Sequence, residues 1–252
     1  MPSFVIHSIC GREIEKKITI SEEDKKLFFI GNLLPDTKQS PKEFVNSKDI
    51  KRISDEKIIT HFKTNHKPIL EYPDLSYFLA KYGDLVKSNS LVFGYFFHLY
   101  CDYYYFKYFL PDKLSFLDEN GNVTEEKNYS FVKSNKNGKI LPVSDFWDRK
   151  RECGIYYEYS RMNQYLIKKY SFSYDSKVYL DYVDSHSIEI PIEEIHGERL
   201  RDLLCDLDYF YHENIENPEF QIFELEDVDT LIHEILDNFM ERYSDLLYNY
   251  GR

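Results

Sequence analysis

The chain has 252 residues, a formal net charge of −12 and an aromatic content of 17%, with 23 Tyr and 19 Phe. Disordered chains are poor in aromatic residues, so this composition predicts a folded protein whose core is large enough for one large domain or two small ones. The low numbers of glycine and proline, nine of each, argue against an all-β or low-complexity chain. The acidic balance, without a Lys/Arg-rich stripe, disfavours attraction to a phosphate backbone, and no nucleic-acid partner is expected.

The helix signals can be followed in chain order. Ser21, followed by three acidic residues, is typical of a helix N-cap, and Ser40-Pro41 and Pro73-Asp74 each resemble a helix start. Pro35 and Pro111 are each expected to end a helix. The predicted helices cover 4–17, 21–34, a segment starting near 40, 73–83, 88–110, a stretch from Ser144 with a break near Cys153-Gly154, 155–170, 191–211 and 226–248.

Residues 113–143 differ in character from the rest of the chain. The turn sequences 118–122 and 135–139, both rich in Asn and Gly, bracket the β-prone run 129–132. We therefore predict a small β-hairpin insertion at 113–143. Residues 172–190 carry no clear helical pattern and are expected to be irregular with a short strand. The simplest architecture is a single all-α domain over 1–252, a multi-helix bundle that carries this insertion.

The apolar segment Leu91–Leu110 is long enough to be compared with a membrane span. It contains His98, Asp102 and Lys107 as well as six tyrosines. A charged group at the centre of a span costs about 3 kcal/mol or more, so no membrane span is predicted here. A buried helix with polar groups on one face fits the segment better.

The cysteines and the N-terminal sequence indicate in which cellular compartment the protein is expected. The four cysteines form no CxxC pair; they are Cys10, Cys101, Cys153 and Cys205. Such usage is typical of reduced thiols in a cytosolic protein. Residues 1–17 have a short apolar run with no basic segment before it, unlike a signal peptide. We therefore predict a cytoplasmic protein.

His98 and Asp102 form the sharpest candidate site. Residues four apart share one face of a helix, so an imidazole and a carboxylate at this spacing can converge on one metal ion. A hydrogen-bonded His–Asp pair inside the core is the alternative. Three further groups of suitable ligand type, His7, Asp36 and His61, lie in or at the ends of apolar segments in the same half of the chain.

The order of these residues resembles a known family. The pattern is His7, then Gly31-x-x-x-Pro35-Asp36, then Thr60-His61-Phe62, then Gly94-x-x-x-His98-x-x-x-Asp102 on an apolar helix. Over about the first 110 residues it is similar to the zinc-dependent phospholipase C and single-strand-specific nuclease superfamily, and in particular to small cytosolic bacterial members. This resemblance implies an all-helical fold and zinc-dependent cleavage of a phosphate ester by metal-activated water.

The resemblance also implies roles for the five residues. Asp36, His61, His98 and Asp102 would bind one ion, and His7 would join Asp102, as a bridging ligand, at a second. Asp36 would also orient or deprotonate the attacking water. A bound zinc ion would lower the pKa of that water towards about 7 and polarise the phosphoryl oxygen.

Two features of the family pattern are missing or displaced. No histidine follows Asp102 within 103–107, and the later His-x-x-x-Glu pattern has only two approximate matches, at His212–Glu216 and His233–Asp237. Each of these two matches is either a pair of metal ligands or, as the alternative, a histidine that is solvated or caps a helix. Glu158 is weighed either as a further site residue or as a surface residue of an amphipathic helix. One or two divalent ions, zinc first, are therefore expected rather than a full cluster.

Three hypotheses follow from the sequence. The first is a metal-dependent hydrolase of a small phosphate ester, of the phosphodiesterase or phospholipase C type. The second is a catalytically degenerate relative in which the metal serves binding or stability. The third is a helical protein without metal, whose histidines and aspartates form a hydrogen-bonded network.

Overall fold

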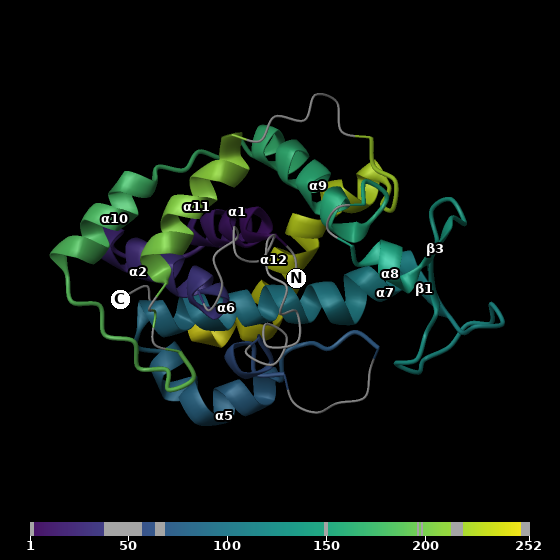
Figure 1. Cartoon of the computed structure of the whole chain (residues 1–252). Helices are drawn as coiled ribbons and strands as arrows, with labels where there is room; N and C mark the ends of the chain where they lie inside the picture. The colour runs from purple at the N-terminus through teal and green to yellow at the C-terminus, as the bar shows by residue number, and fades with distance from the viewer. Residues whose placement is uncertain are drawn as a thin grey trace.

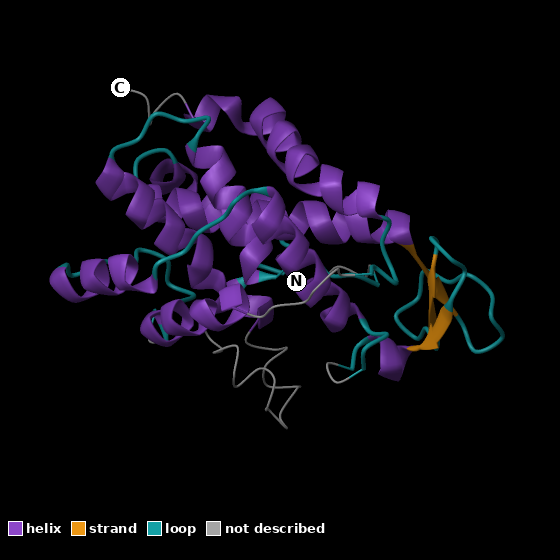
Figure 2. Cartoon of the chain, turned by 90° about the horizontal axis from the view of Figure 1, so that it is seen from above, coloured by secondary structure: helices purple, strands orange, loops and turns teal. Residues whose placement is uncertain are grey.

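The computed structural model of the chain describes residues 3–37, 57–63, 69–148, 151–195, 197, 199–212 and 219–247. Helices dominate this part of the chain, and a small sheet lies at one end of the molecule (Figure 2). The predicted helical fold with a small β insertion is therefore observed. The predicted helix near 40 lies outside the described residues.

The first two helices form where their caps predict them. Helix α1 (Phe4–Glu15) begins after Ser3, whose hydroxyl accepts the Ile6 N–H. Helix α2 (Glu22–Leu33) begins after Ser21, whose hydroxyl accepts the Asp24 N–H at 3.1 Å. Such caps satisfy N–H groups that have no partner within the helix. A 3-10 turn, η1 (Leu34–Asp36), follows α2 and places Asp36 inside the protein.

Helix α6 (Ser90–Tyr104) crosses the middle of the molecule (Figure 1). Every residue from Ser90 to Asp102 is buried, as expected of a helix that is apolar on all sides. The helix continues through a π-helical turn, η2 (Tyr105–Phe109), into α7 (Leu110–Lys113). The prediction that Pro111 ends the helix was therefore wrong. Pro111 occupies the first turn of α7, where a residue without an N–H is tolerated.

Two glycines allow α2 and α6 to cross in close contact. A Cβ atom on Gly31 would lie 1.9 Å from the Leu91 carbonyl oxygen, and one on Gly94 would lie 2.0 Å from the Phe28 carbonyl oxygen. No side chain fits at these distances, so the crossing depends on glycine at both positions. The crossing brings the end of α2 and the turn η1 against the middle of α6.

Six further helices are described. They are α5 (Leu75–Val86), α8 (Val143–Phe146), α9 (Ile155–Lys169), α10 (Ser176–Ser185), α11 (Leu200–His212) and α12 (Leu225–Leu247). Of these, α5 and α12 pack against α6. The predicted starts of α5 at Asp74 and of α9 after Gly154 are confirmed, but α5 continues past Gly83. None of the helices in the described part of the chain is long and apolar enough to cross a membrane.

Two predictions for 172–211 were wrong. The segment expected to be irregular contains α10, which is capped by Asp175 and buries Tyr179 and Tyr182, three residues apart, in the core. The helix expected from Pro191 begins only at Leu200. Local patterns missed α10 because its stability comes from packing, including the stacking of Tyr179 on Phe29 of α2.

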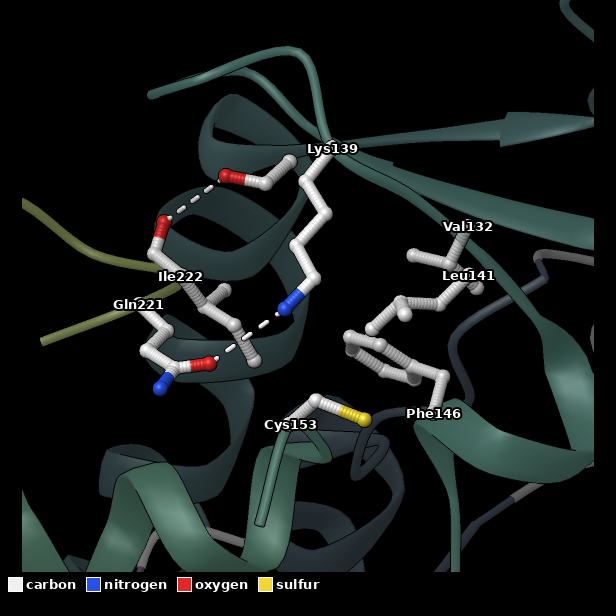
Figure 3. A pocket seen from close by; sticks show the side chains of 8 residues that line it. Val132, Lys139, Leu141, Phe146, Cys153, Gln221 and Ile222 are labelled. Atoms are coloured by element: carbon white, nitrogen blue, oxygen red, sulfur yellow. Dashed lines mark hydrogen bonds between the residues drawn. The ribbon is translucent and has the colours of Figure 1, made fainter. Parts of the chain in front are cut away.

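The insertion is a three-stranded antiparallel sheet rather than a single hairpin. Strands β1 (Leu114–Leu117), β2 (Phe131–Ser134) and β3 (Ile140–Pro142) lie in the order β1-β2-β3, and the β2–β3 connection contains Gly138 with a φ of 70°. Under the sheet is a cavity of about 10 Å³ (Figure 3), which is room for one water molecule at most. The Ser134 hydroxyl donates to the Ile222 carbonyl there at 3.1 Å and ties the sheet to the segment before α12.

Candidate metal centre

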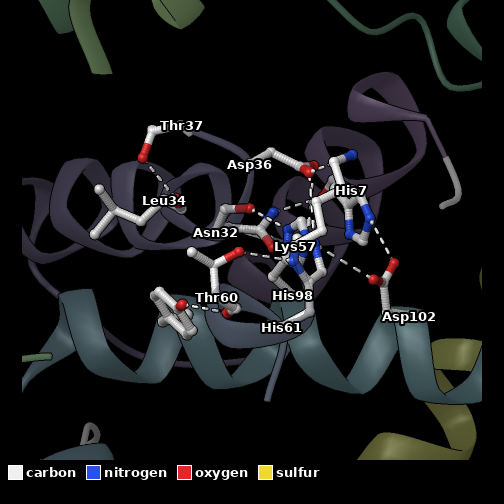
Figure 4. Close-up of polar contacts among 11 residues, drawn as sticks. His7, Asn32, Leu34, Asp36, Thr37, Lys57, Thr60, His61, His98 and Asp102 are labelled. Atoms are coloured by element: carbon white, nitrogen blue, oxygen red, sulfur yellow. Dashed lines mark hydrogen bonds and ion pairs between the residues drawn. The ribbon is translucent and has the colours of Figure 1, made fainter. Parts of the chain in front are cut away.

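Three imidazoles and two carboxylates converge in the interior between α1, the end of α2 and α6 (Figure 4). All five predicted site residues take part; they are His7 on α1, Asp36 on η1, His61 in 57–63, and His98 and Asp102 on α6. Each side chain is at least 98% buried. The spacing of His98 and Asp102 along α6 puts both on the face that meets α1 and α2.

One half of the cluster is centred on His61. Its Nε2 atom lies 3.4 Å from His98 Nε2, 3.5 Å from Asp36 Oδ1 and 3.6 Å from Asp102 Oδ2. The distance from His98 Nε2 to Asp36 Oδ2 is 3.8 Å. Two ligands of a tetrahedral zinc ion, each bonded at about 2.0–2.1 Å, are about 3.3 Å apart. The contacts of His61 are therefore close to this spacing, and His61, His98 and Asp102 each offer a ligand atom within 4.8 Å of the others.

The other half is centred on His7. Its Nε2 atom lies 3.3 Å from Asp102 Oδ1, and its ring stacks on that of His98 at a centroid distance of 3.8 Å. His7, Asp36 and His98 each offer a ligand atom within 4.8 Å of the others. The two oxygens of Asp102 face different histidines, so this carboxylate is placed to bridge two ions.

Hydrogen bonds outside the cluster orient the imidazoles. The Asn32 carbonyl lies 2.8 Å from His98 Nδ1 and can only accept, so Nδ1 carries the proton and Nε2 presents its lone pair to the cluster. The Asn32 side chain donates to the His7 carbonyl at 2.7 Å, which joins α2 to α1. The Thr60 hydroxyl lies 3.0 Å from His61 Nδ1 and leaves Nε2 of that ring facing the carboxylates. Such contacts are typical of metal-ligating histidines.

Several polar atoms of the cluster have no hydrogen bond from any of the described residues. They are both ring nitrogens of His7, Oδ2 of Asp36 and both carboxylate oxygens of Asp102. A buried ionised carboxylate without a partner is costly, so natural proteins pair such groups or bind cations with them. A cation among these atoms would satisfy the carboxylates and the imidazole lone pairs together.

The protonation states of Asp36, Asp102 and His98 are those that a metal requires. Burial alone would raise the pKa of Asp36. The charge of Lys57 and the contacts with His61 and His98 outweigh this effect and hold the pKa of Asp36 below its usual range. Burial also acts to raise the pKa of Asp102, and the three histidines together lower it. Burial, reinforced by His7, lowers the pKa of His98 to about 3. Ionised carboxylates and neutral imidazoles bind divalent ions without first losing a proton.

Two of the other candidates, Glu158 and His233, do not reach the cluster. Glu158 is buried, which excludes its assignment as a surface residue, but its Oε1 accepts the N–H groups of Gln221, Ile222 and Phe223 at 2.7–3.1 Å. Its Oε2 lies 3.1 Å from Arg161, so this carboxylate is already satisfied. His233 is exposed on α12. The side chain of His212 and residues 213–216 lie outside the part of the chain that is described.

Sequence reasoning missed two residues that contact the cluster. Lys57 lies 3.5 Å from Asp36 Oδ1, and Asn32 orients His98 and His7 as described above. The spacing offered a signal for both, because Lys57 precedes His61 by four residues and Asn32 precedes Asp36 by four. Neither residue type is a common ligand for zinc, so neither was predicted as a site residue.

Comparisons of the chain with models of protein families, with curated proteins and with solved structures find no match.

Proposed function

We propose that this chain is a metal-dependent hydrolase of a small phosphate ester, with a preference for diesters. The observation that carries the proposal is the buried set of three imidazoles and two carboxylates, which contains two groups of three ligand atoms within 4.8 Å of one another and three carboxylate oxygens without a hydrogen bond from the described residues. Nitrogen and carboxylate ligands in this arrangement suit zinc better than magnesium or calcium, which prefer sites made of oxygen ligands alone.

The five residues would bind two metal ions and orient the attacking water. His61, His98, Asp36 and Asp102 would hold one ion, and His7 and the second oxygen of Asp102 would hold another. A zinc ion at such a site lowers the pKa of water towards about 7 and polarises a phosphoryl oxygen. Asp36 is suited to accept a hydrogen bond from that water and orient it, because its low pKa makes it a weak base.

A metal-stabilised protein without turnover is the second candidate, and the burial of the site favours it. All five side chains are almost inaccessible, as in closed structural zinc sites. In that case the metal would contribute to folding free energy, and its removal would destabilise the chain.

The test begins with the metal content of the purified protein and of two matched variants. We expect near-stoichiometric zinc in the wild type and in His233→Ala, which alters an exposed histidine, and loss of the metal in His98→Ala. Hydrolysis of bis-p-nitrophenyl phosphate, with and without chelator, then separates the two candidates. Turnover that depends on added zinc supports the hydrolase, whereas chelator-sensitive stability without turnover supports the structural site. Absence of bound metal, with His98→Ala as stable as the wild type, would exclude both.

A further inference from the structure

Lys57 lies at the outer edge of the candidate metal centre. Its Nζ atom and His61 Nε2 both lie 3.5 Å from the same oxygen, Oδ1 of Asp36 (Figure 4). The His61 N–H donates to the Lys57 carbonyl at 3.0 Å, so the two side chains come from successive positions on one face of a helical turn. The Lys57 side chain is 16% exposed, whereas that of Asp36 is 1% exposed. Of these three residues, Lys57 is therefore the one that reaches from the cluster towards solvent.

The charges of the cluster are unbalanced once a metal is bound. In the ion pairs of Asp36 and Asp102 with described residues, two carboxylates and the Lys57 ammonium contribute a net charge of −1 when the imidazoles are neutral. One divalent ion changes this to a net charge of +1, and a second ion makes it more positive still. An excess charge in the interior is costly unless a group of opposite sign accompanies it. The loaded site should therefore attract an anion.

The position of Lys57 also implies electrostatic repulsion between its ammonium and a bound metal ion. Its ammonium and an ion bound by Asp36 would share one carboxylate, and two cations at such a distance repel each other. An anion in contact with both would convert this repulsion into two attractions. A lysine ammonium is a common contact for phosphoryl oxygens because it presents a compact charge with three donors.

We propose that Lys57 is a substrate-contacting residue, whose ammonium binds an anionic oxygen of the phosphoryl group held at the metal centre. This inference rests on the proposed function and adds a residue to it that is not a metal ligand. It requires that metal and anion bind cooperatively, each raising the affinity for the other by the same factor. The competing role for Lys57 is that of a counter-ion that only stabilises Asp36.

Calorimetric titrations with micromolar zinc and with inorganic phosphate test this role. In the wild type, phosphate should bind to the zinc-loaded protein and raise its affinity for zinc. Lys57→Met should weaken phosphate binding to the loaded protein by about tenfold to a hundredfold, the range for one charge-assisted hydrogen bond. Its affinity for zinc in the absence of phosphate should be equal to or higher than that of the wild type. Lys57→Arg should keep most of the phosphate affinity, and Lys87→Met, which removes the exposed lysine that caps the end of α5, is the control for the loss of a positive charge.

The outcomes separate the two roles. If Lys57→Met binds zinc more weakly but phosphate as well as the wild type, Lys57 is a structural counter-ion and the inference is wrong. The inference also fails if phosphate leaves the zinc affinity of the wild type unchanged, a measurement that needs no variant. Neither result contradicts the proposed function as long as the wild type binds zinc and hydrolyses the diester. A wild type that binds no zinc overturns both.

Discussion

Gly94→Ala should lower both stability and metal affinity, because Gly94 lies where α6 meets α2. The new Cβ would lie 2.0 Å from the Phe28 carbonyl oxygen and 2.9 Å from the Asn32 backbone nitrogen. Ordinary contacts need about 3.4 Å in a close-packed interior, so the two helices must separate by more than about 1 Å. Overpacking of this kind costs about 1–3 kcal/mol, and a backbone clash belongs at the upper end of that range. Alanine recovers about 1 kcal/mol in helix propensity, which leaves a net loss of about 2 kcal/mol.

The same separation should disturb the metal centre. The Asn32 carbonyl and His98 Nδ1, now 2.8 Å apart, sit on the two helices that would move apart. Loss of such a supporting hydrogen bond typically lowers metal affinity by about tenfold to a hundredfold. Urea denaturation of the metal-free protein and competition with a zinc indicator would measure the two effects separately.

Gly83→Ala is the matched control for this substitution. Gly83 is also inside a helix, α5, but a Cβ there would meet no atom within 4 Å. It should therefore stabilise the protein by about 0.5–1 kcal/mol and leave zinc affinity unchanged. If Gly94→Ala is as stable as Gly83→Ala, or binds zinc as tightly, the close crossing does not hold the site together and the reasoning is refuted.

Two further predictions concern the rest of the core. Glu158→Gln should destabilise the protein by about 2–4 kcal/mol, because the Glu158 carboxylate accepts three backbone N–H groups and pairs with Arg161. Glu241→Gln, at an exposed position, should change stability by less than about 0.5 kcal/mol. Equal urea midpoints for the two variants would contradict this role of Glu158. The metal-free protein should lose stability as the pH falls from about 6.5 towards 4.5, because burial lowers the pKa of His61 and that of His98, to about 3, so that their unfolded forms take up protons first. Each histidine contributes at most about 1.4 kcal/mol per pH unit in this window; denaturation curves that coincide at pH 7 and pH 5 would show that these rings are not buried neutral.

Features that depend on neighbouring residues could be predicted from the sequence. Ser21 and Asp74 mark real helix starts because a cap needs only a side chain and the next turn. His98 and Asp102 share a face of α6 because the helical repeat alone determines their direction. The turns at 118–122 and 135–139 predicted a β insertion, but not the pairing of β1 with β2, whose partners are 14 to 20 positions apart in sequence.

Other features were decided only by the tertiary structure. Helix α10 forms where the sequence has no clear pattern, because its tyrosines pack on distant aromatic rings. Pro111 continues a helix rather than ending it, because the π-helical turn η2 places it in the first turn of α7. The burial of Glu158 depends on backbone N–H groups more than 60 residues away.

The metal centre combines both kinds of information. The sequence by itself supplied the five ligand types and the helical spacing of two of them, since residue identity and helix periodicity are local properties. Their convergence depends on tertiary contacts, among them the glycine-mediated crossing of α2 and α6, and it places each of the five within 4 Å of at least one other although they come from four segments. Lys57 acquired its place beside Asp36 in the same way, because the contact joins residues that are 21 positions apart, and the helical spacing of Lys57 relates it only to His61.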